Sequence, residues 1–271
     1  MARELPQPDR DRLSALSALV LLTYALLRVV VLPTPAVELR LLGLAVRFEF
    51  NARVVLLSLA AALTAAGADW LIRSHPWRRA DQPTTAHWVL PGLAALGVGA
   101  LLARLPEGPI WWLGLGLAAA LLIAVLVTEY VVVDDDDPRY DGAAVGLTAL
   151  AYLLLAGALF TIRAFNLRAT LAVPMALAAS GAVAWRLLRL HAPRRPALAF
   201  ALVIGALCTQ LAWALLYWPL TPVRMALVLT LVAYVGTGLT IRHLRGELDR
   251  SGLIEFGAVG AIGLAVILLL A

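Results

Sequence analysis

The most conspicuous polar segment of this sequence is a run of acidic residues between two long apolar stretches. The run contains Asp134, Asp135, Asp136, Asp137 and Asp141, interrupted only by Pro-Arg-Tyr. Carboxylate oxygens are the ligands that Mg²⁺ and Ca²⁺ prefer in proteins. The alternative role is structural, because acidic side chains stabilise the N-terminus of a helix that follows them.

Two families of lipid-modifying membrane enzymes carry comparable aspartates, and the chain completes neither pattern. Intramembrane prenyltransferases hold two Asp-rich inner loops face to face, whereas the second candidate loop here is rich in Arg and holds no acid. CDP-alcohol phosphotransferases follow Asp-Gly with Ala-Arg and further aspartates, whereas Asp141-Gly142 is followed by Ala-Ala-Val. The run therefore predicts a solvated acidic turn that starts a helix, and the sequence predicts no catalytic, metal-binding or cofactor-binding residue.

Charged residues inside or beside apolar stretches form the second set of candidates. Burying a charge in lipid costs a few kcal/mol or more, so such residues are usually paired or functional. All of them lie near the ends of the predicted spans, which favours interhelical pairing and snorkelling. Three acids lie at a depth similar to Arg186, which predicts a polar cluster in the inner leaflet; the full set is Arg28, Asp69, Glu129, Arg186 and Glu255. The four histidines fall in predicted inner loops, where we expect contact with solvent or head groups: His75, His87, His191 and His243.

The elements that must position these residues are membrane-spanning helices. The hydrophobic fraction is 62% and the charged fraction 14%, and apolar runs of about 20 residues match the hydrocarbon core of a bilayer. We predict an all-α transmembrane helix bundle, a single integral membrane domain with no soluble domain. It has about nine spans, or eight if the short third or the last is partial: Leu13–Leu32, Val54–Ile72, Trp88–Ala103, Ile110–Val133, Ala143–Ile162, Thr170–Leu188, Ala197–Trp218, Val223–Ile241 and Leu253–Ala271.

Arginine distribution predicts the orientation. With nine spans, fourteen Arg fall on the side of the N-terminus and seven on the other side. Since cytoplasmic loops are enriched in basic residues, we expect a multi-pass protein of the bacterial inner membrane with a cytoplasmic N-terminus and an extracytoplasmic C-terminus. The net charge of +5 predicts contact with anionic lipid head groups, not with nucleic acid.

The first outer connection has a different pattern. Residues 37–50 alternate apolar and charged side chains on each side of Gly43, which is typical of a β-hairpin. We predict a small extracytoplasmic hairpin between spans one and two, with Glu38 and Arg40 opposite Arg47 and Glu49. An amphipathic interfacial helix is the alternative.

One segment of the chain has an internal counterpart. Trp70-Leu-Ile-Arg-Ser-His-Pro-Trp-Arg-Arg resembles Trp185-Arg-Leu-Leu-Arg-Leu-His-Ala-Pro-Arg-Arg, and the Arg, His and Arg-Arg positions are 116 residues apart. A repeat of four spans plus four spans would explain the match. The alternative is that both inner helix ends acquired Arg independently.

A further segment carries a family resemblance. Phe48-Glu-Phe-Asn-Ala-Arg53, with Gly67-Ala-Asp-Trp70 at the end of the next span, resembles uncharacterised bacterial multi-pass proteins grouped as a domain of unknown function. The resemblance covers about the first third of the chain and implies no activity or substrate.

Three functional hypotheses remain open. Short loops and charges confined to span ends favour a non-enzymatic scaffold or accessory subunit with a membrane protein partner. The span count and the internal match favour a transporter of small solutes or lipids. The acidic run at Asp134–Asp141 would serve a lipid-modifying enzyme.

Overall fold

The structure is a computed structural model that describes residues 6–29, 36–41, 44–49, 52–78, 83–192 and 195–269. The chain divides into two compact units, Met1–Asp137 and Pro138–Ala271, and each is described by itself. The described part of the first unit holds α1 (Arg10–Val29), β1 (Ala36–Leu41), β2 (Leu44–Glu49), α2 (Ala52–Arg73), the short 3₁₀ helix η1 (Thr84–Trp88), α3 (Val89–Leu102) and α4 (Pro109–Val131). The second unit holds α5 (Tyr140–Ala164), α6 (Ala169–His191), α7 (Leu198–Leu216), α8 (Pro222–Arg245) and α9 (Arg250–Leu269).

The helices begin and end where the local sequence favours it. The Asp9 carboxylate accepts hydrogen bonds from the backbone N–H groups of Asp11 and Arg12, which caps the N-terminus of α1. Both α4 and α8 begin with proline, which lacks the N–H that a first helical turn leaves unused. Gly246 ends α8 in the left-handed conformation (φ 74°), which glycine adopts without a steric penalty.

The spans predicted from the long apolar runs correspond to helices in the structure. Each predicted span coincides with an α-helix, and the ends differ by at most four residues where both ends are described. Within the described residues, eight helices are long and apolar enough to cross a membrane, α2 to α9, with η1 continuing into α3. This indicates a membrane protein. α1 is not among the eight, and residues 30–32 of the predicted first span lie outside the described part.

The segment between α1 and α2 forms a two-stranded antiparallel ladder of β1 and β2. The register places Glu38 opposite Arg47 and Ala36 opposite Glu49. Arg40 lies opposite Ala45, and not opposite Arg47 or Glu49. Gly43 lies outside the described residues.

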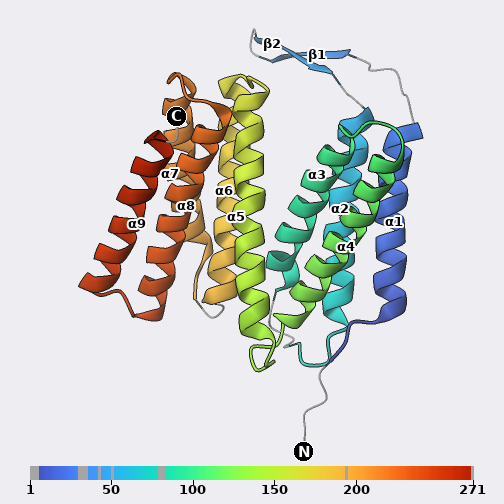
Figure 1. Cartoon of the computed structure of the whole chain (residues 1–271), viewed down its shortest axis with the longest axis horizontal. Helices are drawn as coiled ribbons and strands as arrows, with labels where there is room; N and C mark the ends of the chain where they lie inside the picture. Colours follow the sequence, from blue (N-terminus) through green and yellow to red (C-terminus); the bar gives the residue numbers. More distant parts are fainter. Residues whose placement is uncertain are drawn as a thin grey trace, which may run out of the picture. The chain divides into compact units, whose positions relative to one another are not determined.

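Within each unit the helices run side by side (Figure 1). In the first unit α2 packs on α1, α3 and α4, and α4 also packs on α1 and α3. In the second unit α6 packs on α5, α7 and α8, α8 also packs on α5 and α7, and α9 packs on α8. Of the described residues of α9 only Gly252 is buried, so most of the surface of this apolar helix is not covered by the other described helices.

Candidate functional site

Polar side chains of the first unit gather around η1. Asp69 lies in the last turns of α2 and Glu129 in the last turns of α4, and η1 carries polar groups that bind both. We call this set the η1 cluster: Asp69, Arg73, Thr84, His87, Trp88 and Glu129.

One half of the η1 cluster surrounds Asp69. The Thr84 hydroxyl and the Trp88 indole N–H both donate to Asp69 Oδ1, the indole at 3.2 Å. Arg73 Nε lies 2.7 Å from Asp69 Oδ2, one turn further along α2. Both oxygens of the carboxylate are therefore engaged, which ties η1 to the end of α2.

The other half of the η1 cluster is a histidine–carboxylate pair. His87 Nδ1 lies 2.7 Å from Glu129 Oε2, and because a carboxylate can only accept, the ring N–H donates. Glu129 is fully buried, at 0% exposure. Beside it, the rings of His75 and Tyr130 lie 4.4 Å apart, centroid to centroid. Carboxyl groups from two helices, 60 residues apart in the chain, are thus joined through one short connecting helix.

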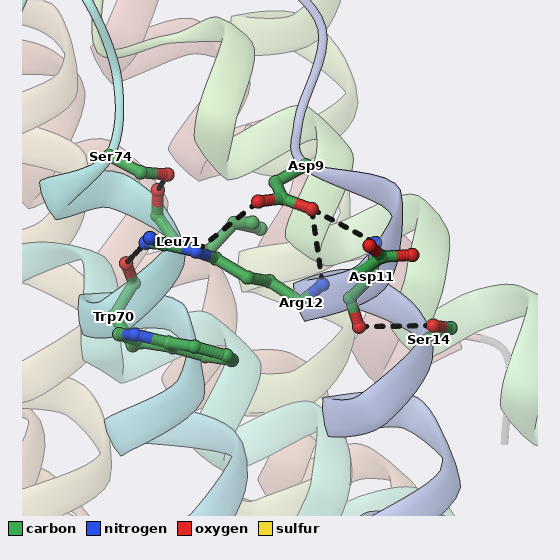
Figure 2. A network of polar contacts seen from close by, with 7 residues as sticks. All are labelled: Asp9, Asp11, Arg12, Ser14, Trp70, Leu71 and Ser74. Carbon is green, nitrogen blue, oxygen red and sulfur yellow. Dashed lines mark hydrogen bonds and ion pairs between the residues drawn. The ribbon is translucent and has the colours of Figure 1, made fainter.

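A second network of the first unit fastens α1 to α2 (Figure 2). Arg12 Nε lies 3.4 Å from Asp9 Oδ2, and Arg12 Nη1 donates to the Trp70 carbonyl at 3.3 Å. The Arg12 guanidinium also lies 4.8 Å from the centre of the Trp70 ring. The carbonyls of a last helical turn have no partner within their own helix, so Arg12 satisfies one of them while it joins the two helices.

In the second unit, basic side chains bind the ends of neighbouring helices. Arg163, near the end of α5, donates to the carbonyls of Leu216, Trp218 and Leu220 around the turn between α7 and α8, at 2.8, 3.2 and 3.4 Å. Arg245, at the end of α8, donates to the carbonyl of His191 at the end of α6.

Replacing Arg163 with Met is expected to destabilise the protein by about 2 kcal/mol, because a hydrogen bond from a charged donor contributes about 1.5–3 kcal/mol. Thermal unfolding of the detergent-solubilised protein measures the loss. Arg168→Met is the matched control, since Arg168 is exposed and lies only four residues after the α5 end. Equal melting temperatures for the two variants would contradict the role given to Arg163.

The structure brings some of the predicted residues together and separates others. Asp69 and Glu129 share the η1 cluster. Glu255 is instead bound by Arg242 at 2.6 Å, between α9 and α8. Arg28 is bound by Glu107 at 2.9 Å, at the opposite end of the first unit's helices. Arg186 is buried in α6, at 1% exposure.

The acidic run is only partly the solvated turn that the sequence predicts. Asp135, Asp136 and Asp141 are exposed, and Asp141 lies in the first turn of α5. Asp134 and Asp137 are buried, at 8% and 5% exposure, so the prediction is wrong for these two. The Asp134 carboxylate accepts from the Asp136 backbone N–H at 3.3 Å, which folds the run back on itself. Among the residues that the structure describes, no group of three His, Cys, Asp or Glu side chains is placed to hold a metal ion.

The role of the histidines and of η1 is not predicted from the sequence. His75 is buried at 4% exposure, and His87 binds a buried carboxylate, so neither is the surface residue that its loop position predicts. Thr84 and Trp88 were likewise not candidates. The available signal was the spacing Thr84-x-x-His87-Trp88, which puts two or three hydrogen-bonding side chains on one turn just before an apolar helix.

Comparison with known proteins identifies a family whose function is unknown. No curated protein and no solved structure matches the chain. The model of a family described as "Protein of unknown function (DUF5656)" matches residues 32–270. The predicted resemblance to a domain of unknown function is confirmed, and it extends well beyond the first third of the chain. The chain therefore belongs to the DUF5656 family of proteins of unknown function.

Proposed function

We propose that this protein is a non-enzymatic scaffold or accessory subunit of the bacterial plasma membrane. The observation that carries the proposal is that charged side chains near the helix ends are bound by other side chains of the protein. Four charged candidates near helix ends have a partner in their own unit: Arg28 is bound by Glu107, Asp69 by Arg73, Glu129 by His87, and Glu255 by Arg242. The pair that matters most for stability is His87–Glu129, which joins η1 to α4 and is largely buried, because exposed ion pairs contribute little.

The proposed topology has nine spans, with α1 as the first and both units in the membrane. The N-terminus is cytoplasmic, the β1–β2 pair is extracytoplasmic, and the C-terminus is extracytoplasmic. The Arg excess on the N-terminal side supports this orientation. On the inner side the Arg-rich helix ends contact anionic lipid head groups.

The proposal implies a membrane protein partner. We expect the natural chain, purified from its own membranes in a mild detergent, to carry one partner at a fixed ratio. Deleting the gene should lower the amount of that partner. A Glu129→Gln variant that folds normally should restore the amount, because a scaffold needs the folded chain and not a reactive carboxylate. If the chain is purified free of other proteins and transports a solute into proteoliposomes, the scaffold proposal is wrong.

A transporter of small solutes or lipids is the second candidate. It is favoured by one observation, the common order of helix contacts in α1–α4 and α5–α8, because many transporters consist of two repeats. Transport in proteoliposomes that is lost when the η1 cluster is altered in a folded variant would establish it.

A further inference from the structure

The two units share one pattern of helix packing. In α1–α4 and again in α5–α8, the second helix packs on the other three, and the fourth helix packs on the first and the third. In both sets the second and third helices make the most extensive contact. Each set therefore forms a closed ring of four helices in chain order, and in each ring the second and fourth helices also contact each other across the ring.

The second helices of the two sets also agree in register. Every buried position between residues 60 and 72 of α2 has a buried position 116 residues later in α6. The pairs are Ala60 and Ala176, Thr64 and Ser180, Gly67 and Val183, Ala68 and Ala184, Leu71 and Leu187, and Ile72 and Leu188. The polar pair behaves alike, since Thr64 donates to the Ala60 carbonyl and Ser180 to the Ala176 carbonyl.

One glycine of each third helix faces corresponding residues of the second helix. A Cβ atom built on Gly92 of α3 would lie 3.7 Å from the Ala61 carbonyl oxygen and 3.8 Å from the Ala65 Cβ. A Cβ atom built on Gly205 of α7 would lie 3.0 Å from the Gly181 Cα and 3.3 Å from the Leu177 side chain. Leu177 and Gly181 are 116 residues after Ala61 and Ala65, so the second-helix residues that face these glycines keep the same offset as the buried face.

Two sequence motifs follow the same correspondence. The end of α2 and the end of α6 both read Arg-x-His-x-x-Arg-Arg, from Arg73 and from Arg189. The connections to the fourth helices both read Pro-x-x-Pro, from Pro106 and from Pro219, 113 residues apart. Basic residues at inner helix ends have a general cause in membrane orientation. Membrane orientation does not explain the shared histidine, the shared prolines or the shared buried face.

We infer that α1–α4 and α5–α8 are two tandem copies of one four-helix membrane unit, with α9 added to the second copy and the β1–β2 pair inserted into the first. Because each copy has an even number of helices, both copies start on the same side of the membrane and are parallel repeats. The inference goes beyond the scaffold proposal, and neither depends on the other.

The shared register is tested by substituting Phe, one position at a time, at residues 60–72 and 176–188 of the full chain. The amount of folded protein is read from a C-terminal fluorescent fusion after size-exclusion chromatography. We expect the two tolerance profiles to agree best at an offset of 116, with the six buried pairs least tolerant and the exposed pair Ala62 and Ala178 tolerant. A best offset other than 116, or two unrelated profiles, would overturn the inference.

The parallel orientation is tested by labelling single cysteines from each side of the membrane in a Cys208→Ala background. Trp77→Cys and Arg195→Cys lie in the connections after α2 and α6, and Arg104→Cys and Tyr217→Cys lie after α3 and α7. We expect the first two to react from the cytoplasmic side, and the last two to react with an impermeant reagent added to intact cells. Opposite sidedness within either pair would exclude parallel repeats.

Discussion

Replacing Glu129 with Ala is expected to destabilise the protein by about 3 kcal/mol, because it removes one partner of a buried hydrogen bond and the packing of a buried side chain. Glu129 is fully buried near the end of an apolar helix and binds His87 Nδ1 at 2.7 Å. The variant removes the carboxylate that fixes η1 to α4 and leaves a cavity in its place. Thermal unfolding in detergent and the yield of folded protein measure the effect.

Two further variants separate the contribution of the carboxylate from a general loss of charge. Glu129→Gln keeps an oxygen that can accept the His87 N–H, so we expect it to lose less than half as much stability. Glu107→Ala is the matched control, since the Glu107 side chain is 88% exposed and an exposed ion pair contributes about 0–1 kcal/mol. If Glu129→Ala and Glu107→Ala melt at the same temperature, the buried pair does not hold the first unit together.

The second large effect is expected at the crossing of α6 and α7. Replacing Gly205 with Val should lower the stability by about 3 kcal/mol, at the upper end of the cost of overpacking a well-packed site. The added Cβ would meet the backbone of Gly181 at 3.0–3.2 Å, and a helix backbone cannot move aside as a side chain can. The two helices would have to separate along much of their length.

Gly157→Val is the control for the Gly205 substitution. Gly157 lies in α5 of the same unit, and a Cβ atom built there has no atom within 4 Å. We expect Gly157→Val to retain the parent's yield and melting temperature, and Gly205→Ala to fall between the two Val variants. Equal behaviour of the two Val variants would show that α6 and α7 do not approach closely at Gly205.

Sequence predicts the helices well because the signal is local. An apolar run of about 20 residues specifies a helix in lipid without reference to the rest of the chain. The predicted span Val54–Ile72 thus corresponds to α2 at Ala52–Arg73, and Ala143–Ile162 corresponds to α5 at Tyr140–Ala164. The orientation of the chain in the membrane remains a prediction, and so does the assignment of α1 as a span.

The candidate site is less predictable because its contacts are not local. Asp69 and Glu129 could be identified as charges in apolar surroundings, but their partners Thr84 and His87 lie 15 and 42 residues away in sequence. A histidine in a short loop looks solvated until the helices on both sides of it are placed. For the same reason the burial of Asp134 and Asp137 follows from their surroundings in the fold and not from the composition of the run.

The end of α6 has a consequence for biosynthesis. Its last carbonyls are bound by Tyr140 from α5 and by Arg245 from α8. Tyr140 has already left the ribosome when α6 is made, whereas Arg245 follows His191 by 54 residues. Synthesis proceeds from the N-terminus at about 5–20 residues per second, so the end of α6 waits several seconds for its second partner. The end of α6 therefore acquires both of its partners only after α8 has been made.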